Sequence, residues 1–131
     1  MNRPDILHKL APFAGETLNI RVSGNCMEPV LEDGQQVRIR RKGRYLPGDI
    51  LVFVDSKERL MAHRLLGSFR RQGQLRHVTR ADNGDRADQS IAADQVLGAV
   101  MLKVPLHQRL RCAAGFLAHA LGWLKRKRLR P

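Results

Sequence analysis

The 131-residue sequence is poor in cysteine, in aromatic residues and in acidic residues. Its two cysteines, Cys26 and Cys112, are too few for the disulfide framework of a small secreted protein, and they favour a reducing compartment. Aromatic residues make up only 5% of the chain, so we expect a mainly aliphatic core. A chain of this length with 43% hydrophobic residues is expected to form one folded domain.

Long apolar runs are missing as well. Asp5, His8 and Lys9 interrupt the first 15 residues, so we expect no signal-peptide core there. The remaining sequence contains no apolar stretch of about 20 residues, which is the length needed to cross a bilayer. These absences predict a cytoplasmic protein that contacts the inner membrane face, if at all, as a peripheral protein.

The shortage of acidic residues leaves the chain strongly basic. It has 24 Lys and Arg against 12 Asp and Glu, a net charge of +12, and five of the positive charges lie within the last seven residues. Such a charge attracts anionic lipid, nucleic acid or an acidic protein partner alike. Because the sequence shows no helix-turn-helix and no RNA-binding aromatic motif, we expect no specific nucleic-acid partner.

Short segments with alternating or continuous apolar residues predict a series of β-strands. The predicted strands cover residues 17–22, 36–41, 50–54, 59–66, 75–80 and 96–104. Turn signals such as Leu46-Pro47-Gly48-Asp49 separate them. Many short strands at this spacing predict a mainly β domain over residues 17–105, with a coiled-sheet or barrel-like architecture.

Helices are expected on both sides of this domain. Residues 1–16 predict a short amphipathic helix that ends at Gly15. Residues 106–131 predict a C-terminal amphipathic helix with a basic tail, in which residues 112–124 contain no Lys, Arg, Asp or Glu. The helix either lies in an anionic membrane interface, as its Trp123 and basic end suggest, or packs on the domain or on a second subunit.

Three segments carry candidate catalytic chemistry. The first is Ser23-Gly24-Asn25-Cys26-Met27-Glu28-Pro29, in which small residues predict a turn that presents the Cys26 thiol. The second, Met61-Ala62-His63-Arg64, contains an imidazole, which titrates near neutral pH and activates a neighbouring thiol. The third, residues 80–88, contains three aspartates, Asp82, Asp85 and Asp88. Cys26 and His63 therefore form a candidate catalytic dyad.

These segments and Gly48-Asp49, in this order, resemble the sequence boxes of the type I signal peptidase and SOS-repressor autoprotease superfamily. The resemblance covers about residues 17–104 and implies that superfamily's fold, with Cys26 in place of the usual serine nucleophile. It implies that His63 is the general base and that either Asp82 or Asp88 orients it. Ser23, Asn25 and Met27 are then predicted to line the substrate and oxyanion site, together with the backbone N–H of Cys26.

The activity that this resemblance implies is cleavage of a leader or precursor peptide after a small residue. The alternative is a catalytically inactive peptide-binding or regulatory module, and a further variant is self-cleavage at Ala14-Gly15. We expect no cofactor and no metal: the three aspartates between Asp82 and Asp88 imitate half of a calcium loop, but no Glu follows at its twelfth position.

Overall fold

The computed structural model describes residues 17–24 and 27–128. The N-terminal helix predicted over residues 1–16 lies outside this range. Asn25 and Cys26 also lie outside it; they belong to the Ser23–Pro29 segment that is predicted to carry the nucleophile, which we call the nucleophile segment. Within the described residues, the chain forms one β-sheet and one long helix.

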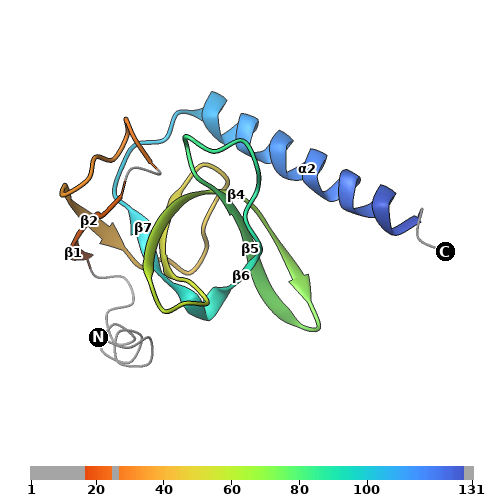
Figure 1. Ribbon diagram of the computed structural model, residues 1–131, viewed down its shortest axis with the longest axis horizontal. Helices are drawn as coiled ribbons and strands as arrows, with labels where there is room; N and C mark the ends of the chain where they lie inside the picture. Colours follow the sequence, from red (N-terminus) through yellow and green to blue (C-terminus); the bar gives the residue numbers. More distant parts are fainter. Residues whose placement is uncertain (1–16, 25–26, 129–131) are drawn as a thin grey trace.

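Seven antiparallel strands form one sheet, in the order β1-β2-β7-β3-β4-β5-β6 (Figure 1). The elements are β1 (Thr17–Arg21), β2 (Gln36–Arg40), β3 (Ile50–Val54), β4 (Leu60–Arg71), β5 (Gln74–Arg80), β6 (Ile91–Ala92), the 3₁₀ turn η2 (Ala93–Gln95), β7 (Val96–Val100) and the helix α2 (Leu106–Arg128). The predictions of a mainly β domain and of a C-terminal amphipathic helix are confirmed.

The expected barrel-like closure is wrong, because the described strands form an open sheet. β1 pairs only with β2, and β6 pairs only with β5, so these two strands are the edges of the sheet. β6 has only two residues, which leaves little backbone to close a barrel against β1. The sheet is nevertheless strongly curved along β4, where a register shift between Leu65 and Gly67 bends the strand against β5 (Figure 1).

The central strand β3 is buried on both faces, which explains its continuous apolar sequence. On one face, Ile50 and Val52 pack in a cluster that includes Ile39 of β2. On the other face, Leu51 and Phe53 pack in a second cluster with residues of β4, β6 and β7. β3 therefore lies at the centre of the fold between β7 and β4, and β4 carries His63.

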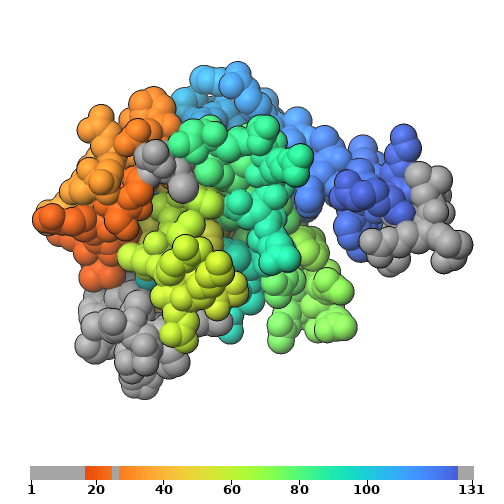
Figure 2. Space-filling model, viewed as in Figure 1, coloured from red at the N-terminus to blue at the C-terminus, as the bar shows by residue number. Residues whose placement is uncertain are grey.

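α2 packs on the sheet through the side chains of Cys112 and Phe116. Both lie in a third apolar cluster with Leu66 of β4 and Val78 of β5. The Phe116 ring covers Gly67 so closely that a Cβ at Gly67 would lie 2.3 Å from the ring. The start of α2 is thus fixed to β4, whereas its C-terminal end extends beyond the sheet (Figures 1 and 2).

No helix within residues 17–24 and 27–128 combines the length and the apolar character needed to cross a membrane.

We expect Gly67→Ala to loosen the attachment of α2. The new methyl group would overlap the Phe116 ring, and relief of such overpacking typically costs about 1–3 kcal/mol of stability. Chemical denaturation measures the loss, and Gly43→Ala is the matched control because a Cβ at Gly43 meets no atom within 4 Å. Equal stability of both variants would contradict the packing described here.

His77 predicts an acid-sensitive component of stability. Its ring is buried, its Nδ1 lies 2.7 Å from the Ser68 hydroxyl, and desolvation lowers its pKa. Below the unfolded-state pKa of about 6.5, His77 binds a proton in the unfolded chain but not in the folded chain. As the pH decreases, the free energy of unfolding therefore falls by up to about 1.4 kcal/mol per pH unit. The loss continues until the pH reaches the lower pKa of the folded state.

This component is measured as the pH dependence of the unfolding free energy between about pH 5 and pH 7.5, where histidine titrates. We expect His77→Gln to flatten the profile, while His107→Gln on the exposed side of α2 leaves it unchanged. Identical slopes for His77→Gln and the unmodified protein would refute this assignment.

Candidate active site

The strand β4 presents His63 to the acidic loop that follows β5. The Nδ1 atom of His63 lies 2.6 Å from Oδ2 of Asp88, and the His63 side chain is only 9% exposed. Because an ionised carboxylate accepts hydrogen bonds, this contact places the imidazole proton on Nδ1 and leaves the lone pair of a neutral ring on Nε2. The contact thus selects the tautomer that a general base requires.

Asp88 is itself held in place by Thr79 on β5. The Thr79 hydroxyl donates to Oδ2 of Asp88 over 2.9 Å, and the Asp88 backbone N–H donates to the Thr79 carbonyl over 2.8 Å. Thr79 is fully buried, so its position is fixed by the sheet. The rigid strand therefore sets the orientation of the carboxylate, and the carboxylate sets the orientation of His63.

The other ring nitrogen of His63 is unusual. Nε2 is buried and has no hydrogen-bond partner among the residues that the structure describes. The Phe53 ring contacts the imidazole edge-on, with 5.9 Å between the ring centroids. A buried polar atom without a partner costs free energy, and a catalytic role is one of the recognised explanations for such an atom in a folded protein.

Arg64, the next residue along β4, forms a separate buried ion pair with Asp82. Its guanidinium donates to both carboxylate oxygens of Asp82 over 2.8 and 2.7 Å, and its Nη1 donates to the Gly48 carbonyl over 2.8 Å. The structure therefore brings Asp88 to His63 and Asp82 to Arg64. Of the two acids that the sequence offered as orienting residues, only Asp88 contacts the imidazole.

The nucleophile segment is fixed on both sides of its undescribed residues, Asn25 and Cys26. On one side, the Gly24 N–H donates to Oδ1 of Asp33 over 2.9 Å. On the other side, Met27 is buried in the core, and its sulfur accepts from the backbone N–H of Asp82 over 3.4 Å. Met27, predicted to line the substrate site, thus links this segment to the acidic loop.

Ser23, a predicted oxyanion or substrate residue, is exposed and lines a small pocket that is open to solvent. The residues that line this pocket come from the end of β1 and from β3 and β4: Ile20, Arg21, Val22, Ser23, Val52, Leu60, Met61 and Ala62. Met61 and Ala62 directly precede His63 on β4. The pocket therefore extends along the strand that carries the imidazole and reaches the segment that carries the thiol.

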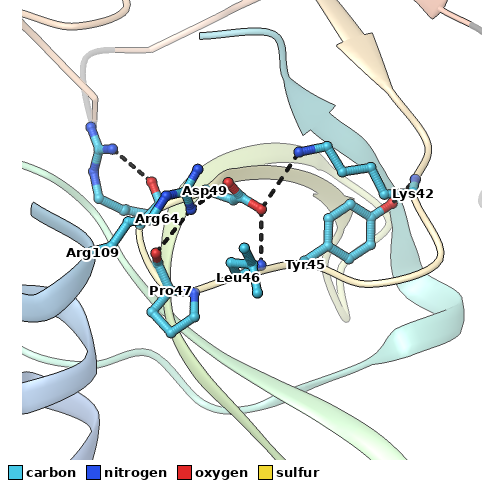
Figure 3. A network of polar contacts seen from close by, with 8 residues as sticks. Lys42, Tyr45, Leu46, Pro47, Asp49, Arg64 and Arg109 are labelled. Carbon is cyan, nitrogen blue, oxygen red and sulfur yellow. Dashed lines mark hydrogen bonds and ion pairs between the residues drawn. The ribbon is translucent and has the colours of Figure 1, made fainter. Parts of the chain in front are cut away.

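A second polar network joins the Pro47-Gly48-Asp49 turn to α2 (Figure 3). Buried Asp49 accepts from the Leu46 N–H over 2.9 Å and from Nη1 of Arg109 over 2.9 Å. Arg109 Nη1 also donates to the Pro47 carbonyl. A Cβ at Gly48 would lie 2.9 Å from the Val104 side chain and 3.0 Å from that of Arg109, so this close approach requires glycine.

Two of these contacts were not anticipated from the sequence. The role of Thr79 follows only from the loop that returns to it, and no motif signals that role. Arg109 is one of several basic residues in its segment, and only the fold reveals that it pairs with Asp49.

Two aspartates of the acidic loop bind side chains of β4. Across residues 17–24 and 27–128, no three His, Cys, Asp or Glu side chains are grouped to hold a metal ion. Asp82 and Asp88 of this loop are instead bound to Arg64 and His63.

Comparison with models of known protein families gives no match to this chain, and comparison with curated proteins gives no significant match either.

We expect Asp82→Asn to destabilise the fold. The change leaves the buried Arg64 guanidinium without its counterion. Breaking a fully buried ion pair in this way typically costs about 3–5 kcal/mol, and because Asp82 is only half-buried we expect a smaller loss here. Urea denaturation measures the loss, with Asp85→Asn as the control because Asp85 lies exposed in the same loop. If both variants unfold at the same urea concentration, the Arg64–Asp82 pair does not stabilise the protein.

Proposed function

We propose that this protein is a peptidase of the signal-peptidase type in which Cys26 is the nucleophile and His63 the general base. The observation that carries the proposal is the state of His63. One of its nitrogens is fixed by Asp88 at 2.6 Å, and the other is buried without a hydrogen-bond partner among the described residues. A base that is oriented by a carboxylate, and whose second nitrogen has no hydrogen-bond partner among the described residues, is the arrangement that activates a nucleophile.

The chemistry follows from this arrangement. Nε2 of His63 takes the proton of the Cys26 thiol, and the thiolate attacks the carbonyl carbon of the scissile peptide bond. The tetrahedral intermediate collapses, the C–N bond breaks, and the imidazolium returns its proton to the leaving amine. Water, deprotonated by the same imidazole, then hydrolyses the thioester and releases the second product with a free thiol.

Three features support this role for the nucleophile segment. The Met27 sulfur accepts from the backbone N–H of Asp82, so the residue after Cys26 contacts the loop that also carries Asp88, the partner of His63. Ser23, three residues before Cys26, lines the same pocket as Met61, which lies on the same face of β4 as His63. The order and spacing of the four sequence segments resemble those of the signal peptidase and SOS-repressor autoprotease superfamily.

The pocket and the sheet edge favour an extended peptide as substrate. β1 is an edge strand whose outer backbone groups pair with no other described strand, and such an edge can bind a peptide by strand addition. The pocket beside it is small, which favours a small side chain before the scissile bond. The proposed substrate is therefore a leader or precursor peptide with a small residue at that position.

The first test is the pH dependence of Cys26 alkylation in a Cys112→Ser background. Cys112 is buried and its pKa is raised by desolvation, so the substitution removes a slow second thiol. We expect a thiolate pKa well below the free value of about 8.5. His63→Ala should abolish this shift of the Cys26 pKa, and Asp88→Asn should weaken it. His107→Ala is the control and should leave the shift intact, because His107 is an exposed residue of α2.

Peptide cleavage separates an active enzyme from an inactive peptide-binding module. Peptides that vary the residue before a candidate bond are incubated with the protein and with Cys26→Ala, and the products are identified by mass spectrometry. Cleavage after Ala or Gly but not after Leu, together with a thioester adduct on Cys26, supports the proposal. A thiol that titrates normally, with peptide binding but no turnover, would overturn it in favour of the inactive module.

A further inference from the structure

One face of α2 carries a row of leucines that the sheet does not cover. Its members are Leu106, Leu110, Leu117, Leu121 and Leu124, with exposed fractions between 51% and 71%. Their spacing of three, four and seven residues places them along one side of the helix. We call these five residues the leucine row.

The leucine row remains exposed because the helix uses another face to bind the sheet. Arg109, Cys112 and Phe116 make the contacts to Asp49, Leu66 and Gly67, and they project from a different side of α2. The C-terminal end of the helix extends past the sheet, where no other described element covers it (Figures 1 and 2). Trp123, which is 50% exposed, lies at this end next to Leu124 in the sequence, but on the side of the helix that carries Phe116.

The charge of α2 determines which partner fits this surface. The helix contains six basic residues and no acidic residue: Arg109, Arg111, Lys125, Arg126, Lys127 and Arg128. Pairing with a second copy would bring two cationic helices together, and no carboxylate on either helix would offset their repulsion. An anionic surface instead attracts the exposed Arg111, Lys125 and Arg126, while the leucines enter an apolar layer.

We propose that the leucine row docks α2 onto a membrane that contains anionic lipids, with the helix lying in the plane of the interface. Exposed leucines, a tryptophan and a basic end are the composition of an interfacial helix. The attachment of α2 to β4 then holds the β domain against the lipid surface. The proposal does not depend on the proposed peptidase activity, and its test needs no substrate.

The test uses the full chain and large unilamellar vesicles made of phosphatidylcholine, with or without phosphatidylserine. Trp123 is the only tryptophan of the chain, so its fluorescence reports on α2 alone. We expect co-flotation with the phosphatidylserine vesicles and a blue shift of the Trp123 emission. Binding should fall at least about tenfold when the salt concentration is raised to about 0.5 M, because salt screens the charge attraction.

Two variants separate the apolar and the charged contributions. Leu117→Ser with Leu121→Ser removes exposed apolar surface and should weaken vesicle binding more than about tenfold. Lys125→Gln with Arg126→Gln should reduce the preference for phosphatidylserine. Leu46→Ser is the control, because Leu46 is 47% exposed but lies on the β domain, and this variant should bind as the unmodified protein does.

The proposal fails if the full chain does not bind phosphatidylserine vesicles at low salt. It also fails if analytical ultracentrifugation shows a dimer that the two leucine substitutions dissociate, because the leucine row would then be an interface between two copies. Unchanged flotation of the leucine variant would likewise overturn it, since the attraction would then come from charge alone.

Discussion

The buried guanidinium of Arg64 is the group on which the rest of the candidate site depends. It binds the Gly48 carbonyl at the start of β3 and both oxygens of Asp82 in the acidic loop, while β4 carries it next to His63. A buried cation is tolerated only when such partners surround it. The contacts of Arg64 therefore fix β4, the turn before β3 and the acidic loop relative to one another around the imidazole.

The two acids of the loop have different environments because each meets a different partner. Asp82 is saturated by a bidentate contact with a guanidinium, and its backbone N–H binds the Met27 sulfur, so it links the loop to the nucleophile segment. Asp88 gives one oxygen to both His63 and the Thr79 hydroxyl. The first arrangement holds the loop in place, and the second orients the imidazole of His63. This division of roles underlies the proposed chemistry.

Local patterns in the sequence predicted the strands well but not the way they associate. The apolar run of β3 was predicted with the bounds that the structure shows, Ile50–Val54. The end of β4 was placed too early, because Gly67–Arg71 belong to a hairpin with β5 whose mixed polarity hides the strand. The two-residue strand β6 was missed, and the expectation of barrel-like closure was wrong, because closure depends on whether distant sheet edges meet.

The candidate site shows the same limit. The sequence identified His63 and two possible acidic partners, but the choice between Asp82 and Asp88 depends on the path of the loop. That path is set by Arg64 at one end and by the return of Asp88 to Thr79 at the other. The helical pattern of α2 was equally visible, whereas the face that it buries is decided by the fit of Phe116 over Gly67.

The Pro47-Gly48-Asp49 turn has a further consequence, because it is shared by the helix and the candidate site. Arg109 of α2 binds the Pro47 carbonyl and the Asp49 carboxylate, while Arg64 binds the Gly48 carbonyl between them. If α2 detached from the sheet, the buried Asp49 carboxylate would lose its contact with Arg109. Asp49 directly follows Gly48, whose carbonyl binds Arg64. The attachment of α2 and the position of Arg64 therefore depend on the same three-residue turn.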